Sequence, residues 1–299
     1  MLKITGLKKS YRGFPVLRNL NMNIEKGDVY GLVGKNGCGK TTTMNIICNI
    51  IPKDDGDVSF ENDKIKVGYL PESPALYGYM NGFEYLNFIG ACCEYQGDIL
   101  SRTAEVLSVT GMQNGAERLI KGYSRGMNQR IGIAAALYAN PDLLILDEPT
   151  SALDPQGRAE VMEIITKLAA SGATIILCTH ILSDVERVAN KVGILQGGVM
   201  AVEGSINDIK RKYQGANALH VRLNNTPEPA DPVCGIDLAE KCEIWQGGLT
   251  LYAKPGVSEA ELFYKTVTTM AEQKIVPEAV EFKRQTLEQI YIGVCSGTL

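Results

Sequence analysis

The segment Gly34-Lys35-Asn36-Gly37-Cys38-Gly39-Lys40-Thr41 constrains the fold of this chain more than any other feature. It follows the apolar run VYGLV (29–33) and leads into TTTMNIICNII (41–51), which we expect to be helical. Its pattern is G-x-x-x-x-G-K-[ST], in which glycines let backbone N–H groups turn toward an anion without a Cβ clash. The free N–H groups at the start of a helix also favour negative charge. The segment therefore predicts a phosphate-binding loop between a strand and a helix.

The side chains of this loop are suited to a nucleotide. Lys40 supplies a point charge for β- and γ-phosphates, and Thr41 offers a hydroxyl to Mg²⁺. A chance match occurs in roughly one chain of this length in a hundred, and the expected strand and helix on either side make chance a weaker explanation. We therefore assign nucleotide binding to Gly34, Lys35, Asn36, Gly37, Cys38, Gly39, Lys40, Thr41 and Thr42.

Two further short apolar runs, DLLILDEP (142–149) and ATIILCTH (173–180), are typical of parallel strands that are covered on both faces. Residues 74–140 read mostly as helix, and this alternation predicts an α/β fold with a helical subdomain. The helical part begins with a group of aromatic residues that either fill its core or form a contact surface. They are Tyr77, Tyr79, Phe83, Tyr85, Phe88 and Tyr95.

Polar residues follow two of these expected strands. Asp147 and Glu148 end the run 143–146, and His180 follows the run 173–178. Because ligands bind at the carboxyl ends of parallel strands, Asp147 is a candidate for holding Mg²⁺ and Glu148 for activating water as a general base. His180 is a candidate for contacting the γ-phosphate and fixing that water with Glu148. The alternatives are a solvated acidic turn before Pro149 and a structural histidine.

The sequence changes character near residue 214, which predicts one domain at 1–214 and a small α+β domain at 215–299. In the second part, NNTPEPADPV (224–233) reads as a loop and IWQGGLTLYA (244–253) as a hairpin with a Gly-Gly turn. Residues 258–274 predict an amphipathic helix that begins with a Ser cap and a Glu three residues later. Residues 278–285 predict a strand and 286–297 a terminal helix.

Charge and hydropathy limit the partners. Thirty Lys and Arg against 34 Asp and Glu give a formal net charge of −4, without the basic excess that nucleic-acid binding requires. No apolar run approaches the ~18–20 residues of a membrane-spanning helix, and the N-terminus MLKITGLKKSYRG has no signal-peptide core. The eight cysteines contain no C-x-x-C pair, so we expect buried, reduced thiols in a cytosolic protein.

Together these segments resemble the ATP-binding cassette (ABC) transporter ATPase family over residues 1 to about 214. The resemblance rests on segments that occur in the family's order: KKSYRG (8–13), GKNGCGKT (34–41), GYLPE (68–72), YSRGMNQR (123–130), LLILDEP (143–149), SALD (151–154) and His180. The signature segment, normally LSGGQ, here keeps Ser124 and Gly126. This form is similar to cassettes that serve drug, lantibiotic or sodium exporters, and PEAVEFKRQTLEQIYIGVCSG (277–297) is similar to the ending of their accessory domain.

The resemblance implies a P-loop NTPase core that binds ATP and Mg²⁺. It implies that Tyr11 stacks on adenine and that Glu72, which stands where glutamine is usual, still binds Mg²⁺ or water. It also implies that Ser124 and Gly126 complete the ATP site of a second subunit, in a homodimer or a paired dimer. ATP hydrolysis would then drive a separate integral membrane permease, which places the chain at the cytoplasmic face of the membrane.

Two other functions are compatible with parts of this pattern. An ABC ATPase without a transport role, acting as a regulatory or mechanical switch, usually has two fused cassettes or long coiled coils, and neither is visible here. A nucleotide sensor with vestigial hydrolysis is disfavoured by the presence of Lys40, Asp147, Glu148 and His180. The Cys38 thiol, within the phosphate loop, suggests that alkylation could block phosphate entry.

Overall fold

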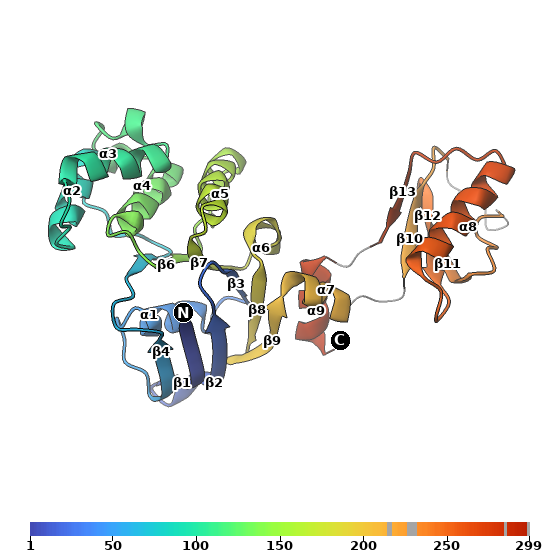
Figure 1. Cartoon of the computed structure of the whole chain (residues 1–299), viewed down its shortest axis with the longest axis horizontal. Helices are drawn as coiled ribbons and strands as arrows, with labels where there is room; N and C mark the ends of the chain where they lie inside the picture. The colour runs from blue at the N-terminus through green and yellow to red at the C-terminus, as the bar shows by residue number, and fades with distance from the viewer. Residues whose placement is uncertain (214–216, 226–231, 284–285, 298–299) are drawn as a thin grey trace. The chain divides into compact units, whose positions relative to one another are not determined.

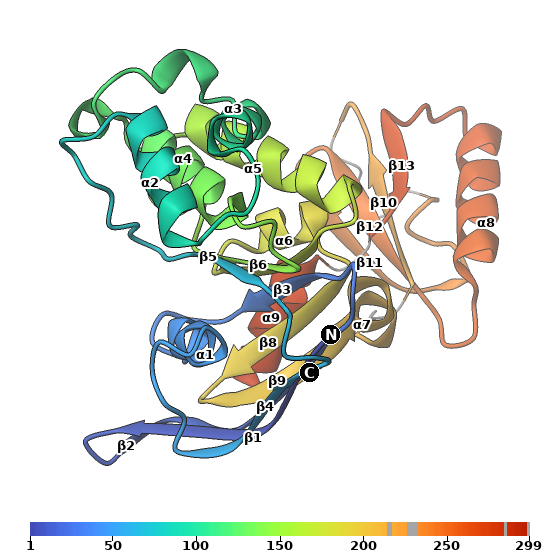
Figure 2. The same cartoon turned by 60° about the vertical axis from the view of Figure 1, so that its left-hand side comes forward.

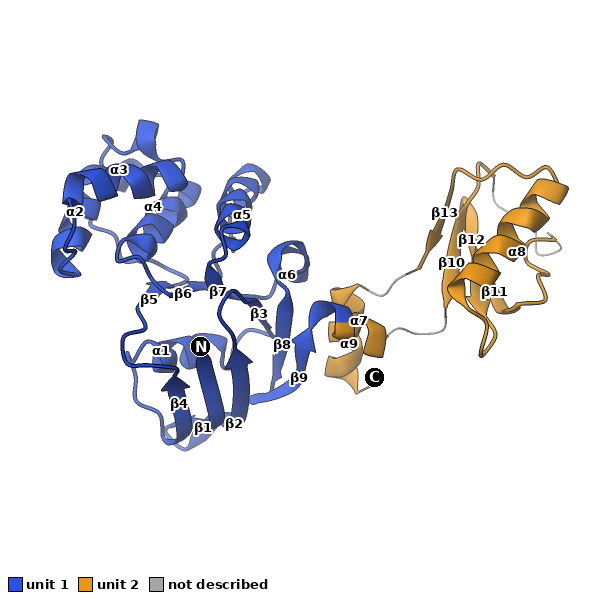
Figure 3. Cartoon of the chain, in the orientation of Figure 1, with its two compact units in different colours: residues 1–207 blue, residues 208–299 orange. Residues whose placement is uncertain are grey.

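The computed structural model describes residues 1–213, 217–225, 232–283 and 286–297. The chain divides into two units, Met1–Asn207 and Asp208–Leu299 (Figure 3). The domain boundary expected after residue 214 lies outside the described residues, because 214–216 are not among them.

Unit 1 is built on a six-stranded sheet with the order β5-β6-β7-β3-β8-β9. Its neighbouring strands are parallel except for β8 and β9, which are antiparallel. All residues of β3, β6 and β7 are buried, which explains why these strands are continuous apolar runs in the sequence. The strands are β3 (Val29–Val33), β5 (Val67–Leu70), β6 (Leu143–Asp147), β7 (Thr174–Thr179), β8 (Lys191–Gln196) and β9 (Val199–Ser205).

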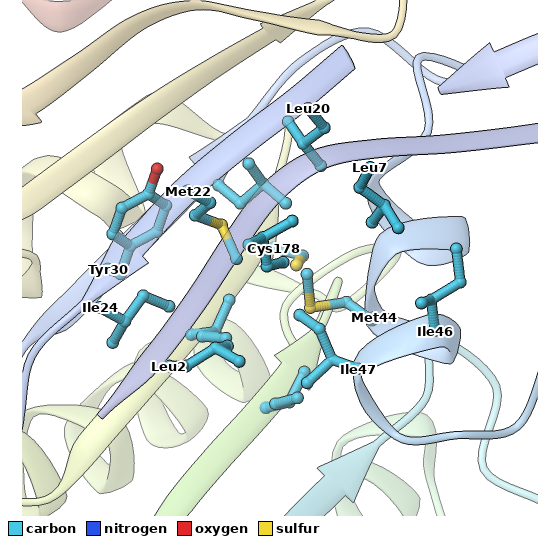
Figure 4. Packing of buried hydrophobic residues seen from close by; sticks show 14 of the residues in the cluster. Leu2, Leu7, Leu20, Met22, Ile24, Tyr30, Met44, Ile46, Ile47 and Cys178 are labelled. Carbon is cyan, nitrogen blue, oxygen red and sulfur yellow. The ribbon is translucent and has the colours of Figure 1, made fainter. Parts of the chain in front are cut away.

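A second, antiparallel sheet has the order β2-β1-β4 and contains β1 (Leu2–Tyr11), β2 (Phe14–Ile24) and β4 (Asp55–Phe60). Alternate residues of β1 are buried, as expected for a sheet with one face on the core. These side chains pack with those of helix α1 (Lys40–Ile47) and of β3, β6 and β7 in one hydrophobic cluster. Figure 4 shows part of it, with Met44 of α1 beside Cys178 of β7. Helix α1, which follows the predicted phosphate loop, is therefore held firmly between the two sheets (Figure 2).

The expected helical subdomain contains α2 (Gly82–Cys92), α3 (Ile99–Val109) and α4 (Arg125–Leu137), with short 3₁₀ segments at Gln113–Gly115 and Ile120–Gly122. It lies at the opposite end of unit 1 from the three-stranded sheet (Figure 1) and has its own core. The core role holds for three of the aromatic residues, and a contact role for the others stays a prediction. Tyr85, Phe83 and Tyr95 pack in the core, whereas Tyr77, Tyr79 and Phe88 are 41%, 73% and 38% exposed.

Two more helices belong to unit 1, and a third spans its boundary with unit 2. They are α5 (Pro155–Ala170), α6 (Leu182–Val188) and α7 (Ile206–Lys212). Asp154 caps α5 by accepting a hydrogen bond from the Gly157 N–H at 3.3 Å. Among the described residues, no helix combines the length and the apolar character that crossing a bilayer requires.

Unit 2 contains a four-stranded antiparallel sheet with the order β11-β12-β10-β13. The predicted hairpin is present, but its turn is Gln246-Gly247, since Gly248 already pairs with Trp245. Ser258 and Thr286 cap the two helices in capping boxes with Glu261 and Gln289. The elements are β10 (Ala218–Arg222), β11 (Ala239–Trp245), β12 (Gly248–Ala253), α8 (Glu259–Glu272), β13 (Ala279–Phe282) and α9 (Leu287–Ser296).

The sequence predicted the helices of unit 2 well and its strands less well. The expected strand 278–285 is only Ala279–Phe282 within the described residues, and 284–285 lie outside them. Strand β10 was not predicted. Most of the predicted loop 224–233 also lies outside the described residues, because 226–231 are not among them.

Candidate active site

The predicted phosphate loop connects β3, which ends at Val33, to α1, which begins at Lys40. Gly37 and Gly39 adopt left-handed conformations with φ of +79° and +113°, which glycine tolerates best. At Gly39 a Cβ atom would also lie 2.6 Å from Leu17 Cδ2. The loop therefore requires glycine for both its backbone conformation and its close packing.

Lys40 is buried at the start of α1, and its Nζ donates a hydrogen bond to the Gly34 carbonyl oxygen at 2.8 Å. The same Nζ lies 3.5 Å from Glu148 Oε1. The loop thus holds the ammonium group between its own backbone and the carboxylate at the end of β6.

The carboxyl ends of β6 and β7 bring the other predicted side chains together. Thr41 Oγ1 donates to Asp147 Oδ2 at 2.7 Å, and His180 Nδ1 lies 2.9 Å from Glu148 Oε2. Glu148 has a left-handed backbone with φ of +49°, and its N–H donates to the Cys178 carbonyl at 2.8 Å. This unusual conformation turns the chain sharply between Asp147 and Glu148, so that the two carboxylates reach different partners.

Asp147 is fully buried, and that burial is the main reason why its pKa is raised. The carboxylates of Glu148 and Glu72 raise it further, while the Thr41 hydrogen bond and the Lys40 charge lower it. Its Oδ1 is buried and has no hydrogen-bond partner among the described residues. A buried acceptor in a carboxylate-rich site calls for a cation, so these residues fit Mg²⁺.

The small number of protein oxygens at this site also suits Mg²⁺. No group of three or more His, Cys, Asp or Glu residues placed to hold a metal occurs within the described part of the chain. Mg²⁺ typically needs only one or two protein oxygens when substrate phosphates and water supply the rest. Thr41 and Asp147 match that requirement.

A cavity of about 440 Å³ opens beside the phosphate loop. This volume lies in the range of small-molecule sites, about 300–1,000 Å³. Most of the predicted residues line it together with two residues that were not predicted, Val16 and Ser151. The predicted residues that line it are Asn36, Gly37, Gly39, Lys40, Thr41, Thr42, Glu72, Glu148 and His180.

Several predicted residues do not line this cavity. Tyr11 lies at the end of β1 with 46% of its surface exposed. Gly34 is buried within the loop, and the Lys35 side chain is exposed. The Cys38 side chain packs against the hydrophobic cluster beneath the loop. The Cys38 side chain is therefore not part of the cavity lining, and the expectation that its alkylation blocks phosphate entry stays a prediction.

Ser124 and Gly126, which the resemblance assigned to a second subunit's site, also lie outside the cavity. Ser124 caps α4, accepting a hydrogen bond from the Met127 N–H at 3.2 Å, and its side chain is exposed. Gly126 is buried, and a Cβ atom there would lie 3.6 Å from Gly157 Cα. The exposed helix start could receive an anion from outside the chain.

A buried network behind the site escaped the sequence analysis. Asp184 of α6 accepts hydrogen bonds from Thr150 Oγ1 at 2.6 Å and from Arg158 Nε and Nη2 at 3.0 and 2.7 Å. Thr150 follows Glu148 by two residues, and Asp184 follows His180 by four. No sequence pattern pairs residues 34 positions apart, and the local signal is a Thr and an Asp just beyond the candidate site residues.

Comparison with known proteins agrees with this geometry. Residues 17–151 match the family model described as "ABC transporter". The lantibiotic transport ATP-binding protein SrtF of Streptococcus pyogenes is 39% identical over 231 residues, which cover 75% of this chain and 96% of that protein. The linearmycin resistance ATP-binding protein LnrL of Bacillus subtilis is 32% identical, with 100% of this chain and 99% of that protein covered.

Solved structures show the same fold. An ATP-binding subunit of an ABC transporter is 27% identical, with a TM-score of 0.64, and the match covers 71% of this chain and 93% of that one. A dimeric ATP-binding cassette in a post-hydrolysis state, bound to ADP and Pi, is 25% identical, with a TM-score of 0.62 and coverage of 69% and 99%. The α/β P-loop fold and the family resemblance predicted from the sequence are confirmed. This chain belongs to the ABC transporter family, as one of its ATP-hydrolysing ATP-binding proteins.

Proposed function

We propose that this chain binds MgATP at the loop Gly34–Thr42 and hydrolyses it to drive export through a separate membrane protein. The observation that carries the proposal is the convergence of Lys40, Glu148 and His180 on one cavity through contacts of 2.9 to 3.5 Å. Glu148 and His180 follow strands β6 and β7, and Lys40 begins the helix after β3, so their meeting depends on the folded sheet and matches the needs of phosphoryl transfer.

In this proposal Glu148 is the general base. His180 holds its Oε2 at 2.9 Å and so fixes the direction of the carboxylate, while Oε1 is buried 3.5 Å from Lys40 Nζ and has no hydrogen-bond partner among the described residues. Lys40 leaves its bond to the Gly34 carbonyl to meet the β- and γ-phosphates. A water molecule between Glu148 and the γ-phosphate would lose a proton to the carboxylate as it attacks.

Thr41 and Asp147 would hold Mg²⁺ through their side-chain oxygens. The ion, when bound, supplies charge neutralisation at the phosphates. Glu72 lines the same cavity and adds negative charge near Asp147. We propose that Glu72 contacts the ion or one of its waters, in place of the glutamine that is usual there.

The site is proposed to be completed by a second cassette. Ser124 and Gly126 lie outside the cavity of their own chain, and the exposed Ser124 marks a helix start that can meet a phosphate. A solved relative is a dimer bound to ADP and Pi. Tyr11, which is 46% exposed, is proposed to stack on adenine.

The names of the relatives support a proposed partner and location. Their names refer to transport of lantibiotics and bacitracin and to resistance to linearmycin. We propose an integral membrane permease as the partner, with the chain peripheral at the cytoplasmic face of the membrane and without a nucleic-acid partner. The exposed aromatic side chains Tyr77, Tyr79 and Phe88 are the proposed contact on the helical subdomain.

The variant Glu148→Gln tests this proposal because it removes the base while keeping the shape of the side chain. With MgATP it should hydrolyse at least about 100-fold more slowly than the native chain and form a dimer, measured by light scattering. With ADP it should be monomeric, as the matched control. A Glu148→Gln chain that binds MgATP and stays monomeric contradicts the shared site.

A further inference from the structure

Two cysteines of unit 2 lie in contact, although their sequence spacing matches no motif. Cys242 Sγ lies 2.8 Å from Cys234 Sγ, across a separation of eight residues. Both residues are half-buried. The expectation of buried thiols holds for Cys178 and is wrong for Cys92 and Cys93, which are exposed. Cys234 and Cys242 thus combine partial exposure with a direct sulfur–sulfur contact.

The backbone around each of the two cysteines is fixed, by a turn at Cys234 and by strand pairing at Cys242. Cys234 lies in the turn at residues 232–235, beside the fully buried Val233. Cys242 belongs to the edge strand β11, where it pairs with Leu251 of β12. Both cysteines pack against the hydrophobic core of the sheet. Neither segment needs to rearrange to keep the thiols together.

The separation is close to that of a covalent bond. A disulfide bond is about 2.05 Å long, so the sulfur atoms need to approach by only about 0.8 Å. A shift of that size lies within ordinary side-chain rotation and leaves the pairing of β11 intact. The pair is thus arranged for an intrachain bond between the turn and the edge strand.

We propose that Cys234 and Cys242 form a dithiol site that reacts with low-molecular-weight disulfides and closes to an intrachain disulfide. One cysteine, as the thiolate, attacks a sulfur of the external disulfide, forms a mixed disulfide and releases one thiolate. The second cysteine, also as the thiolate, attacks the protein sulfur of the mixed disulfide and releases the other. The two protein thiols lose two electrons and two protons, and the external disulfide is reduced to two thiols.

The second step is favoured by proximity. The resolving thiol is already in contact with the sulfur it attacks, so closure competes well against a second external molecule. The product ties the turn at 232–235 to the edge of the sheet and restricts the unfolded chain. Unit 2 should therefore resist unfolding better when oxidised. This inference does not depend on nucleotide chemistry.

Oxidised glutathione is the probe for this site. The folded full-length chain is incubated with a glutathione redox buffer, quenched with acid, digested and analysed by mass spectrometry. We expect one linked product that joins the peptides of Cys234 and Cys242. Oxidation should also raise the denaturant midpoint of unit 2, followed through the fluorescence of Trp245, the chain's one tryptophan.

Three variants sharpen the test. Cys234→Ser and Cys242→Ser each remove the resolving partner, so the remaining thiol should accumulate as a stable glutathione adduct at least about 10-fold above its level in the native chain. The double variant Cys92→Ser/Cys93→Ser is the matched control and should keep the link. The proposal is overturned if the native folded chain accumulates glutathione adducts at both cysteines, or if the link forms only after denaturation.

Discussion

Thr150 Oγ1 donates a hydrogen bond to Asp184 Oδ2 at 2.6 Å, and both residues are buried. This bond joins the segment that follows Glu148 to helix α6, which follows His180. Arg158 holds the other carboxylate oxygen of Asp184 through Nε and Nη2. Asp184, Thr150 and the half-exposed Arg158 therefore form a hydrogen-bonded network that supports the contact between Glu148 and His180.

Thr150→Val keeps the shape of the side chain and removes this hydrogen bond. We expect kcat for ATP hydrolysis to fall by about 10-fold or more, because small displacements of catalytic groups are costly. KM should change by less than about 3-fold, since the phosphate loop is untouched. Steady-state ATPase measurements test this, and Thr150→Ser, which keeps the hydroxyl, should retain most of the activity. Equal rates for all three proteins would show that the network does not position the base.

Asp147→Asn should increase the folding stability of the chain and weaken its response to MgATP. Burial raises the pKa of Asp147 in the folded chain. Its contribution to stability is therefore fully present below the ordinary Asp pKa of about 3.9 and is lost as pH rises through the raised folded value. At neutral pH the variant should melt at a higher temperature than the native chain without nucleotide. It should also lose the additional stabilisation that MgATP gives.

Thermal unfolding with and without MgATP measures both effects. Asp142→Asn is the matched control, because Asp142 is exposed and accepts a hydrogen bond from the Lys66 N–H away from the cavity. A lower melting temperature for Asp147→Asn without nucleotide would contradict the assignment of this carboxylate as a buried, unfavourable charge.

Unit 2 should show a pH dependence that originates at His220. Its ring stacks on Trp245 with centroids 4.5 Å apart, and its Nδ1 lies 2.9 Å from Thr250 Oγ1. Burial lowers the pKa of His220, and the charges of Lys283 and Arg222 add to this effect against the opposing Glu281. The stability that the neutral ring contributes is therefore present above pH of about 6.5 and is lost as pH falls through the folded value.

Denaturant unfolding followed by Trp245 fluorescence measures this dependence. We expect the midpoint to fall between pH of about 7 and 5, and His220→Gln to flatten that part of the profile. The other histidine, His180, lies in unit 1, so His180→Gln should leave the fluorescence profile unchanged. If the denaturant midpoint of His220→Gln falls with pH as steeply as that of the native chain, the pH dependence comes from other groups.

The Cys38 thiol should react slowly with alkylating reagents, because it packs against the core beneath the phosphate loop. N-ethylmaleimide should modify the exposed Cys92 and Cys93 first, with ATPase activity retained at that stage. Peptide mapping together with activity measurements tests the order. Loss of activity in step with Cys38 modification, with protection by ATP, would support the hypothesis that alkylation of this thiol blocks phosphate entry.

Local sequence signals predicted much of this structure. The phosphate loop, the buried strands and the capped helices were predicted because glycine conformations, apolar runs and cap residues act over a few neighbouring positions. Thr41 and Asp147 were each expected near Mg²⁺, and the structure joins them by a direct hydrogen bond.

The features that sequence reasoning missed depend on contacts between distant segments. Thr150 and Asp184 meet only because α6 packs behind β7, and Cys234 and Cys242 meet only because a turn folds over an edge strand. The direction of the Cys38 side chain depends on the loop's backbone and on the core beneath it. None of these contacts has a fixed spacing that a pattern could detect.

Calorimetric titration of the folded chain with MgATP measures nucleotide binding at the phosphate loop. We expect saturable heat with one nucleotide per chain in the native protein. Lys40→Ala, with its folding checked by circular dichroism, should bind at least about 100-fold more weakly, because a buried cation at the phosphates is lost. An absence of binding heat in the folded native chain, or equal affinity in Lys40→Ala, would contradict nucleotide binding at the phosphate loop.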